Sequence, residues 1–186
     1  MIRNKRVFLD VDGVLADFAG HLIQYYDEVE DKDTSVTTWA DERIVKHFHL
    51  TKNDVNFWLS IPPLIDPNDI NFPIAGYCTA RLGNVPEGIT EIWLRENGFP
   101  SAPVWLTDTN ESKVPMLLEM CVDIMLDDAP HNFRELNAAG IKTCLMDMPY
   151  NRDYKTNLRV DSIQEFGVFA NPYFMNKLEN KKWLER

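Results

Sequence analysis

The stretch Val7-Phe8-Leu9-Asp10-Val11-Asp12-Gly13-Val14-Leu15-Ala16-Asp17-Phe18 decides the fold of this chain. It opens with the apolar residues of a strand, reaches Asp10 and Asp12, and turns through Gly13 into a helical pattern. Side chains of an extended strand alternate between faces, so the two aspartates start on the same side. Neighbouring carboxylates repel, and each raises the pKa of the other unless a cation or proton intervenes. The pair fits a Mg²⁺ site or an acid/base pair, and taken alone it fits a solvated strand end equally well.

The composition is that of a globular chain with one core. The sequence has 186 residues, of which 45% are hydrophobic and 26% charged, which is enough for one domain with an insertion. The net charge of -10 argues against long nucleic acid as a partner, because such binding depends on neutralised phosphates. A small phosphorylated ligand stays compatible with this charge, since a bound divalent cation can invert the local field.

The cysteines and the lengths of the apolar runs indicate where in the cell the protein is located. Cys78, Cys121 and Cys144 show no CxxC spacing, and each lies in or beside an apolar run, which is typical of free thiols in a reducing cytosol. The basic N-terminal residues are followed by acids and not by a signal-peptide core, and no apolar run approaches membrane-spanning length. We therefore expect a cytoplasmic protein without a membrane partner.

Segments with strand and helix patterns alternate along the chain. Beyond the first strand, the sequence predicts strands at residues 74–79, 103–107, 124–126 and 141–146. Helical periodicity marks residues 15–26, 87–97, 113–120 and 132–139. This rhythm predicts an α/β fold with a Rossmann-like parallel sheet flanked by helices on both faces. Ligands of such sheets bind beyond the carboxyl ends of the strands.

An aromatic-rich segment separates the first strand from the rest of the pattern. It is expected to form two short helices at 41–50 and 52–59, the second capped by Thr51 or Asn53 and ended by Pro62-Pro63. The charged stretch 27–33 fits a solvated loop. We expect a single domain over 1–186, with a core of 1–16 and 73–186 and a small helical cap of about 17–72 inserted after the first strand.

Polar residues stand at or soon after the strand ends. Their types fit phosphoryl transfer, which needs carboxylates for Mg²⁺, a carboxylate nucleophile, and a hydroxyl and an ammonium to hold phosphate. The set consists of Asp10, Asp12, Thr79, Arg81, Lys113, Asp127 and Asp128. Because the carboxyl ends of parallel strands share one edge, we expect these side chains to meet at one rim.

Most of these residues also have a plainer interpretation. Thr79 fits an ordinary strand-end hydroxyl, and Lys113 fits a solvated lysine, although the start of a helix disfavours a cation. The pair Asp127-Asp128 fits a helix cap, but two acids exceed what a cap needs. Arg81 fits either a surface residue or a group that reaches an anionic substrate.

The histidines are weaker candidates. His47 and His49 have the spacing of a metal pair, yet in an amphipathic stretch they are more typical of a solvated face. His131 follows the acidic pair and therefore lies near the expected rim, where a substrate contact is one interpretation.

The motifs together resemble a known group of enzymes. Asp10-Val11-Asp12-Gly13-Val14, Thr79, Lys113 and Asp127-Asp128 resemble the motifs of the haloacid dehalogenase superfamily of phosphohydrolases. The heptapeptide Asp12-Gly13-Val14-Leu15-Ala16-Asp17-Phe18 and the insertion ending Phe57-Trp58-Leu59-Ser60-Ile61-Pro62-Pro63 are similar to the 5′(3′)-deoxyribonucleotidases. The resemblance implies a Mg²⁺-dependent phosphomonoesterase, with a nucleoside monophosphate as the expected small substrate and a monomer or homodimer as the expected state.

The resemblance also implies catalytic roles. Asp10 would attack phosphorus and become an aspartyl phosphate. Asp12 would protonate the leaving alkoxide and then activate the water that hydrolyses the intermediate. Thr79 would hydrogen-bond a phosphate oxygen, and Lys113 would neutralise charge on the phosphoryl group and on Asp10.

The same resemblance implies a metal site. Asp10 and the backbone carbonyl of Asp12 would reach Mg²⁺, Asp127 would ligate it, and Asp128 would support it directly or through water. An EF-hand interpretation of the loop after Asp10 fails, because Val14, Leu15 and His21 stand where that loop needs an oxygen ligand, a glycine and a glutamate.

The insertion would act as a lid that excludes water and contacts the leaving group. The expected substrate contacts are Phe18, Trp39, Ala80 and Arg81. Phe57 and Trp58 also fit stacking on a base, but the core of the cap is the interpretation that we prefer for them. Stacking of a base on an aromatic ring is worth roughly 1–3 kcal/mol.

Two alternatives stay open. A phosphatase for sugar phosphates or for 3′-phosphate ends of nucleic acids would use the same chemistry. A non-catalytic phospho-receiver switch uses similar groups, but its acidic pair comes first in the chain and its phosphoacceptor later. Here the order is reversed, and the second acid of the first motif, Asp12, has no use in a switch that keeps its acyl phosphate.

Overall fold

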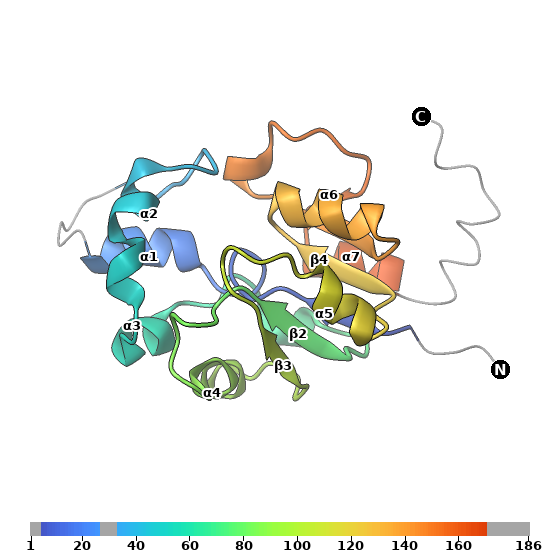
Figure 1. Cartoon of the computed structure of the whole chain (residues 1–186), viewed down its shortest axis with the longest axis horizontal. Coiled ribbons are helices and arrows are strands. Elements are labelled where there is room, and N and C mark those ends of the chain that lie inside the picture. Colours follow the sequence, from blue (N-terminus) through green and yellow to red (C-terminus); the bar gives the residue numbers. More distant parts are fainter. Residues whose placement is uncertain (1–4, 27–32, 171–186) are drawn as a thin grey trace.

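A computed structural model describes residues 5–26 and 33–170 of the chain. Residues 179–186, whose charged sequence predicts a helical tail, and most of the stretch 27–33 lie outside these residues. Within the described part, six strands form one parallel sheet in the order β3-β2-β1-β4-β5-β6 (Figure 1). The strands are β1 (Val7–Leu9), β2 (Gly76–Thr79), β3 (Val104–Leu106), β4 (Ile124–Asp127), β5 (Lys142–Met146) and β6 (Arg159–Val160). The predicted α/β fold with a Rossmann-like parallel sheet is confirmed.

The first strand lies in the middle of the sheet. Phe8 pairs with Gly76 of β2 on one side and with Met125 of β4 on the other. All three residues of β1 are buried, as expected for a strand covered on both faces. Three strands that carry the predicted site residues, β2, β1 and β4, are therefore neighbours, and their carboxyl ends meet.

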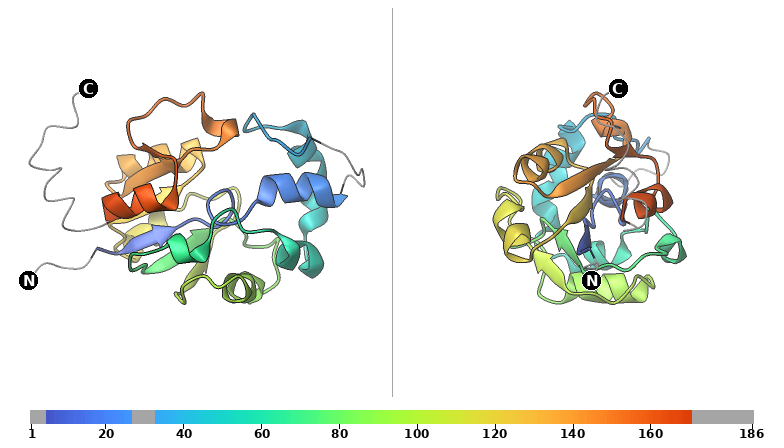
Figure 2. Two further views of the ribbon diagram at one scale, coloured as in Figure 1. Left: turned by 180° about the vertical axis from the view of Figure 1, so that it is seen from behind. Right: turned by 90° about the vertical axis from the view of Figure 1, so that its right-hand side faces the viewer.

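Helices cover both faces of the sheet (Figure 2). The side chains of β1 and β4 alternate between the two faces. Phe8 and Met125 pack toward α5 (Val114–Glu119) and α6 (Pro130–Ala138). Leu9 and Leu126 belong to the larger cluster, which contains residues of α4 (Ile89–Glu96) and α7 (Ile163–Ala170). This period of two is the reason that the apolar strands read as continuous runs in the sequence.

The segment between β1 and β2 is helical and lies at one end of the sheet (Figures 1 and 2). It contains α1 (Phe18–Tyr26), α2 (Glu42–His47), the 3-10 helix η1 (Phe48–Thr51), α3 (Val55–Ser60) and the 3-10 helix η2 (Pro67–Asp69). Phe57 and Trp58 fill its interior and are fully buried or nearly so. We call residues 17–72 the cap; its division from the core stays a prediction.

Some local expectations were wrong. Neither Thr51 nor Asn53 caps α3: the cap is Asp54, whose carboxylate accepts from the backbone N–H of Phe57 at 3.0 Å. Thr51 instead donates to the carbonyl of Phe48, and Asn53 adopts a left-handed φ of 62°. The helix expected at 41–50 divides into α2 and η1.

Two elements after β5 were not predicted. The strand β6 and the helix α7 follow a 3-10 helix, η3 (Pro149–Asn151). β6 forms the edge of the sheet beside β5, and α7 packs in the larger hydrophobic cluster. β6 has two residues, which is too short for a sequence pattern. Among the described helices, none is both long and apolar enough to cross a membrane.

Candidate active site

A pocket of about 280 Å³ lies where the carboxyl ends of the central strands face the cap. Core residues form its floor and cap residues form its opposite wall. Its lining includes Asp10, Asp12, Gly13, Phe18, Trp39, Trp58, Thr79, Ala80, Lys113, Asp128, His131, Asn132 and Tyr150. Most residues that the sequence predicted for the site, from both the core and the cap, therefore surround one cavity.

Three carboxylates form a cluster at the floor. Asp10, Asp127 and Asp128 are buried, and each offers an oxygen within 4.8 Å of the others. The ammonium of Lys113 lies between two of them, with Nζ 2.6 Å from Oδ2 of Asp10 and 2.8 Å from Oδ2 of Asp127. The cluster thus holds one buried cation and three carboxylates, which carry an excess of negative charge when all three are ionised.

The burial of this cluster changes its protonation. Burial raises the pKa of Asp10 to about 7; the ammonium of Lys113 opposes this shift and the charge of Asp127 adds to it. Burial, reinforced by the charge of Asp127, raises the pKa of Asp128 well above its ordinary value. Burial alone would lower the pKa of Lys113, but the two carboxylates beside it raise that pKa above its ordinary value. Lys113 is therefore a permanent cation, whereas the carboxylates call for additional positive charge to be fully ionised.

Neighbouring donors fix the acids on β4. Asp127 accepts from the backbone N–H of Ala129 at 2.9 Å, and the amide of Asn132 lies 3.2 Å from both of its carboxylate oxygens. Tyr150 donates its hydroxyl to Oδ2 of Asp128 at 2.6 Å. Asn132 and Tyr150 were missed by the sequence analysis, although Asn132 stands in the first turn of the helix that follows the acidic pair.

Gly13 leaves room for this arrangement. Its φ of 73° lies in the left-handed region, which glycine adopts without strain. A Cβ atom at this position would overlap the carboxylate of Asp128 and the hydroxyl of Tyr150. The glycine that follows Asp12 is therefore required both by the turn and by the packing of the cluster.

Asp12 lies apart from the cluster and pairs with an arginine. Arg81 donates from Nε to Oδ2 of Asp12 at 2.8 Å and from Nη2 to Oδ1 at 2.6 Å, and the hydroxyl of Thr79 lies 3.5 Å from Oδ2. Arg81 is fully buried and does not line the pocket. The expectation that Arg81 is a surface residue is therefore wrong, and its guanidinium is occupied by Asp12.

Aromatic side chains form the cap side of the pocket. The rings of Phe18 and Trp58 stack at 5.6 Å, and both line the cavity. Trp39 is 49% exposed and makes edge contacts with two rings of the core. Its ring centroid lies 5.5 Å from that of His131 and 5.6 Å from that of Tyr150. Trp39 thus connects the cap with the core across the pocket.

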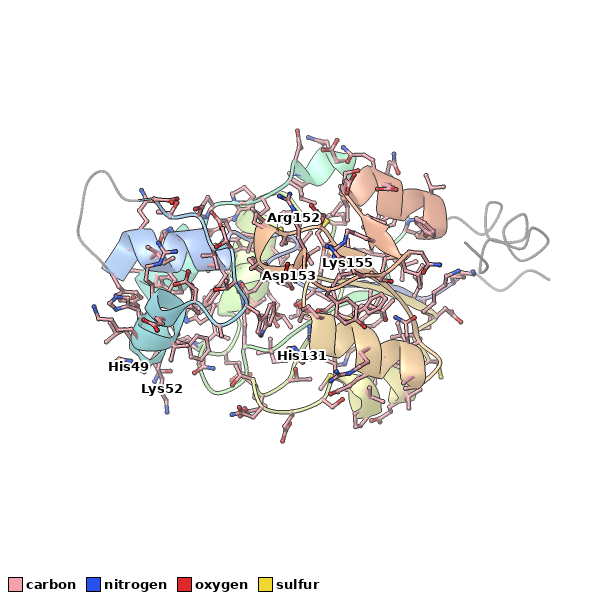
Figure 3. The ribbon with its side chains drawn as sticks, turned by 90° about the horizontal axis from the view of Figure 1, so that it is seen from above. His49, Lys52, His131, Arg152, Asp153 and Lys155 are labelled. Atoms are coloured by element: carbon pink, nitrogen blue, oxygen red, sulfur yellow. The ribbon has the colours of Figure 1, made fainter. Side chains whose placement is uncertain are left out.

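The histidines lie in different surroundings. His131 stands at the end of α6 that faces the cap, whereas His49 lies on the outer side of the cap (Figure 3). His47 is buried and stacks on Tyr26, so the expectation of a solvated face is wrong for this residue. Of the three, only His131 lines the pocket.

Comparison with known proteins identifies a family and a fold. The model of the family "5′ nucleotidase, deoxy (pyrimidine), cytosolic type C protein" matches residues 76–171. A HAD-superfamily hydrolase, subfamily IA, variant 1, from Geobacter sulfurreducens is 15% identical, with a TM-score of 0.54 over 90% of this chain and 96% of that chain. A haloacid dehalogenase-like hydrolase from Streptococcus pneumoniae is 10% identical, with a TM-score of 0.56 over 92% of this chain and 100% of that chain. At these identities the two structures show a shared fold and no more. A search of curated proteins returns no match.

Proposed function

This chain belongs to the 5′ nucleotidase, deoxy (pyrimidine), cytosolic type C protein family and is a phosphoric monoester hydrolase, and from that premise we propose that it hydrolyses nucleoside monophosphates through an aspartyl phosphate on Asp10. The observation that carries the proposal is the position of Asp10. Its carboxylate lies at the floor of the pocket, 2.6 Å from the ammonium of Lys113, with an aromatic wall opposite. A nucleophile held beside a fixed cation at the end of a cavity suits attack on a phosphate monoester.

The first step transfers the phosphoryl group to the protein. A carboxylate oxygen of Asp10 forms a bond to phosphorus while the bond from phosphorus to the ester oxygen breaks. The carboxyl of Asp12, in its protonated form, gives its proton to that oxygen, so the nucleoside leaves as an alcohol. Asp12 ends this step as the carboxylate that pairs with Arg81 in the structure. Lys113 and the hydroxyl of Thr79 stabilise the negative charge of the transferring group.

The second step frees Asp10. The carboxylate of Asp12 takes a proton from water, and the oxygen of that water forms a bond to phosphorus. The bond between phosphorus and Asp10 breaks, which yields inorganic phosphate, the carboxylate of Asp10 and the protonated carboxyl of Asp12. One side chain thus acts as acid and then as base, and the cycle closes without a further reactant.

The acidic cluster fits Mg²⁺. Asp10, Asp127 and Asp128 supply carboxylate oxygens, which are the ligands that this ion prefers, and their excess negative charge is buried. Bound there, Mg²⁺ would neutralise the charge of the phosphate and orient it toward Asp10. The side chain of Asp12 belongs to the ion pair with Arg81, so we assign Asp12 a contribution to the metal site through its backbone carbonyl alone.

The cap supports a nucleoside as the leaving group. Phe18 and Trp39 give the pocket an apolar wall suited to stacking on a base, and Trp58 packs behind Phe18. The net charge of -10 disfavours a long nucleic acid as substrate. The cytoplasmic location and the oligomeric state stay predictions.

Two alternatives are tested by the same experiment. Phosphate release is measured with deoxy- and ribonucleoside 5′- and 3′-monophosphates, sugar phosphates and a 3′-phosphorylated oligonucleotide, each with Mg²⁺ and with EDTA. We expect metal-dependent turnover of the nucleotides. Turnover confined to sugar phosphates or to the oligonucleotide would contradict the substrate class, and a folded protein without any turnover would favour a phospho-receiver switch.

A further inference from the structure

Arg81 and Asp12 form a two-point ion pair at the edge of the pocket. Two nitrogens of the guanidinium donate to the two carboxylate oxygens, at 2.8 Å and 2.6 Å. Such a fork fixes the plane of a carboxylate as well as its position. The side chain of Asp12 is 24% exposed while that of Arg81 is 0% exposed. Asp12 therefore faces the pocket, and Arg81 holds it from behind.

The surroundings of Arg81 fix the guanidinium in turn. Its central carbon lies 4.7 Å from the ring centroid of Trp58 and 6.0 Å from that of Trp93. Nη1 lies 3.4 Å from the hydroxyl of Thr90. Both tryptophans are themselves tied by hydrogen bonds, from Trp58 to the carbonyl of Thr51 and from Trp93 to the carbonyl of Ile61. The guanidinium is thus held between a cap helix and a core helix.

Trp58 connects this support with the substrate. Its ring lines the pocket, stacks on Phe18 and packs over Arg81. Arg81 therefore contacts both the aromatic side of the pocket, through Trp58, and the proposed proton donor, Asp12. A carboxyl that must give a proton to one oxygen and later take a proton from water needs a fixed orientation for both steps.

We propose that Arg81 is a positioning residue that orients the carboxylate of Asp12 for proton transfer and links that orientation to the cap through Trp58. The inference rests on the proposed function, because it assigns Arg81 a role only through Asp12. Arg81 itself does not touch the substrate, since it does not line the pocket. A purely structural ion pair is the competing explanation, because a buried arginine needs a partner wherever it stands.

The experiment combines two positions. Arg81→Lys keeps the charge but loses the fork, and it is made in the wild-type chain and in Asp12→Asn. Arg95→Lys is the matched control. Arg95 is an exposed arginine of α4, and its guanidinium lies 3.9 Å from the carboxylate of Glu96 in the same helix. Thermal unfolding of each variant shows that it is folded. kcat and KM are then measured with a nucleoside monophosphate and with p-nitrophenyl phosphate, whose leaving group needs no proton.

The proposal expects a specific pattern. Arg81→Lys lowers kcat for the nucleotide by about 10- to 100-fold, and KM changes by less than about 3-fold, because proton transfer and not binding is impaired. With p-nitrophenyl phosphate the variant releases a burst of p-nitrophenol followed by slow turnover, since only the second step still needs Asp12. In the Asp12→Asn background, Arg81→Lys changes the residual rate by less than about 2-fold. Arg95→Lys leaves both activities unchanged.

Other outcomes distinguish a failure of the role proposed for Arg81 from a failure of the proposed function. Equal losses from Arg81→Lys in the wild-type and Asp12→Asn backgrounds would show that Arg81 acts independently of Asp12 and would overturn the proposal. A loss confined to KM, or to the melting temperature, would overturn it in favour of a structural pair. A wild-type chain without phosphatase activity would overturn the proposed function and this role with it, whereas an active chain with additive effects would overturn this role alone.

Discussion

The hydroxyl of Tyr150 donates a 2.6 Å hydrogen bond to Oδ2 of Asp128, and the two groups lie directly above Gly13. The 3-10 helix η3, which carries Tyr150, is itself held in place, because the amide of Asn151 donates to the carbonyls of Asp128 and Met146, each at 2.8 Å. A segment far from the first strand thus orients one carboxylate of the acidic cluster. Such outer partners of metal ligands normally affect metal affinity.

Tyr150→Phe removes this donor and leaves the ring in place. We expect the affinity for Mg²⁺, measured by titration calorimetry, to fall by about 10-fold or more. Tyr154→Phe is the control, because Tyr154 belongs to the same part of the chain and its ring packs on Phe133, outside the pocket. Equal affinities of Tyr150→Phe and the wild type would show that the hydrogen bond does not orient Asp128 for the metal.

Gly13→Ala should remove Mg²⁺ binding and phosphatase activity. The added Cβ would overlap Asp128 and Tyr150 and would also meet a left-handed φ of 73°. Gly83→Ala is the matched control, since its φ is 78° but nothing lies within 4 Å of the added atom. Both variants pay the backbone strain of about 1 kcal/mol, and only the first should lose Mg²⁺ binding. If both retain it, the close packing around Gly13 is not needed for the site.

Asp128→Asn tests the electrostatics of the cluster by the pH dependence of stability. The pKa of Asp128 is raised well above 3.8, so between that value and the raised one the folded protein binds a proton that the unfolded chain has lost. Stability without metal should therefore fall as the pH rises from about 5 to about 8, and less so in the variant. The measurement is the melting temperature in EDTA at both values.

Mg²⁺ should oppose this loss by replacing the proton. We expect it to raise the melting temperature of the wild type more at about pH 8 than at about pH 5, by a few degrees, and to have little effect on Asp128→Asn. Asp153→Asn removes an exposed acid of the loop after η3 and should keep the wild-type response (Figure 3). A response to Mg²⁺ that survives in Asp128→Asn would place the ion elsewhere.

Trp39→Ala tests the stacking wall. Because stacking is worth roughly 1–3 kcal/mol per base, KM for a nucleoside monophosphate should rise by about 5-fold or more. KM for deoxyribose 5-phosphate, which has no base, should change little. Phe18→Ala should show the same contrast and also a lower melting temperature, since Phe18 packs on Phe48, Phe57 and Trp58 inside the cap. Equal changes in KM for both substrates would exclude base stacking.

The sequence predicted those parts of the site that lie at strand ends. Asp10, Thr79 and Asp127 follow or end apolar runs whose pattern is unambiguous, and parallel strands bring their carboxyl ends to one edge. The acidic cluster follows from that topology, whereas Lys113 reaches it from the start of α5, seven residues after the edge strand β3. What the pattern leaves open is the direction of each side chain, which is set by packing.

Arg81 shows why the rest was not predictable. It lies two residues after Thr79, and its position alone was compatible with a surface residue or with contact to an anionic substrate. The choice is made by Asp12, 69 residues earlier in the chain, and by Trp58, which removes the guanidinium from solvent. Tyr150 reaches the site from the short 3-10 helix η3. The sequence of this segment predicts only a loop after the last core strand, near the expected site, and does not single out the tyrosine.

The most direct test of the central claim is the capture of the phosphorylated enzyme. The protein is mixed with a nucleoside monophosphate and Mg²⁺, quenched in acid within one turnover, reduced with borohydride and mapped by mass spectrometry. We predict that the modified residue is Asp10, that hydroxylamine added before the borohydride prevents the modification, and that Asp10→Asn is folded and carries none. A label on another residue, or steady turnover by Asp10→Asn, would contradict the account.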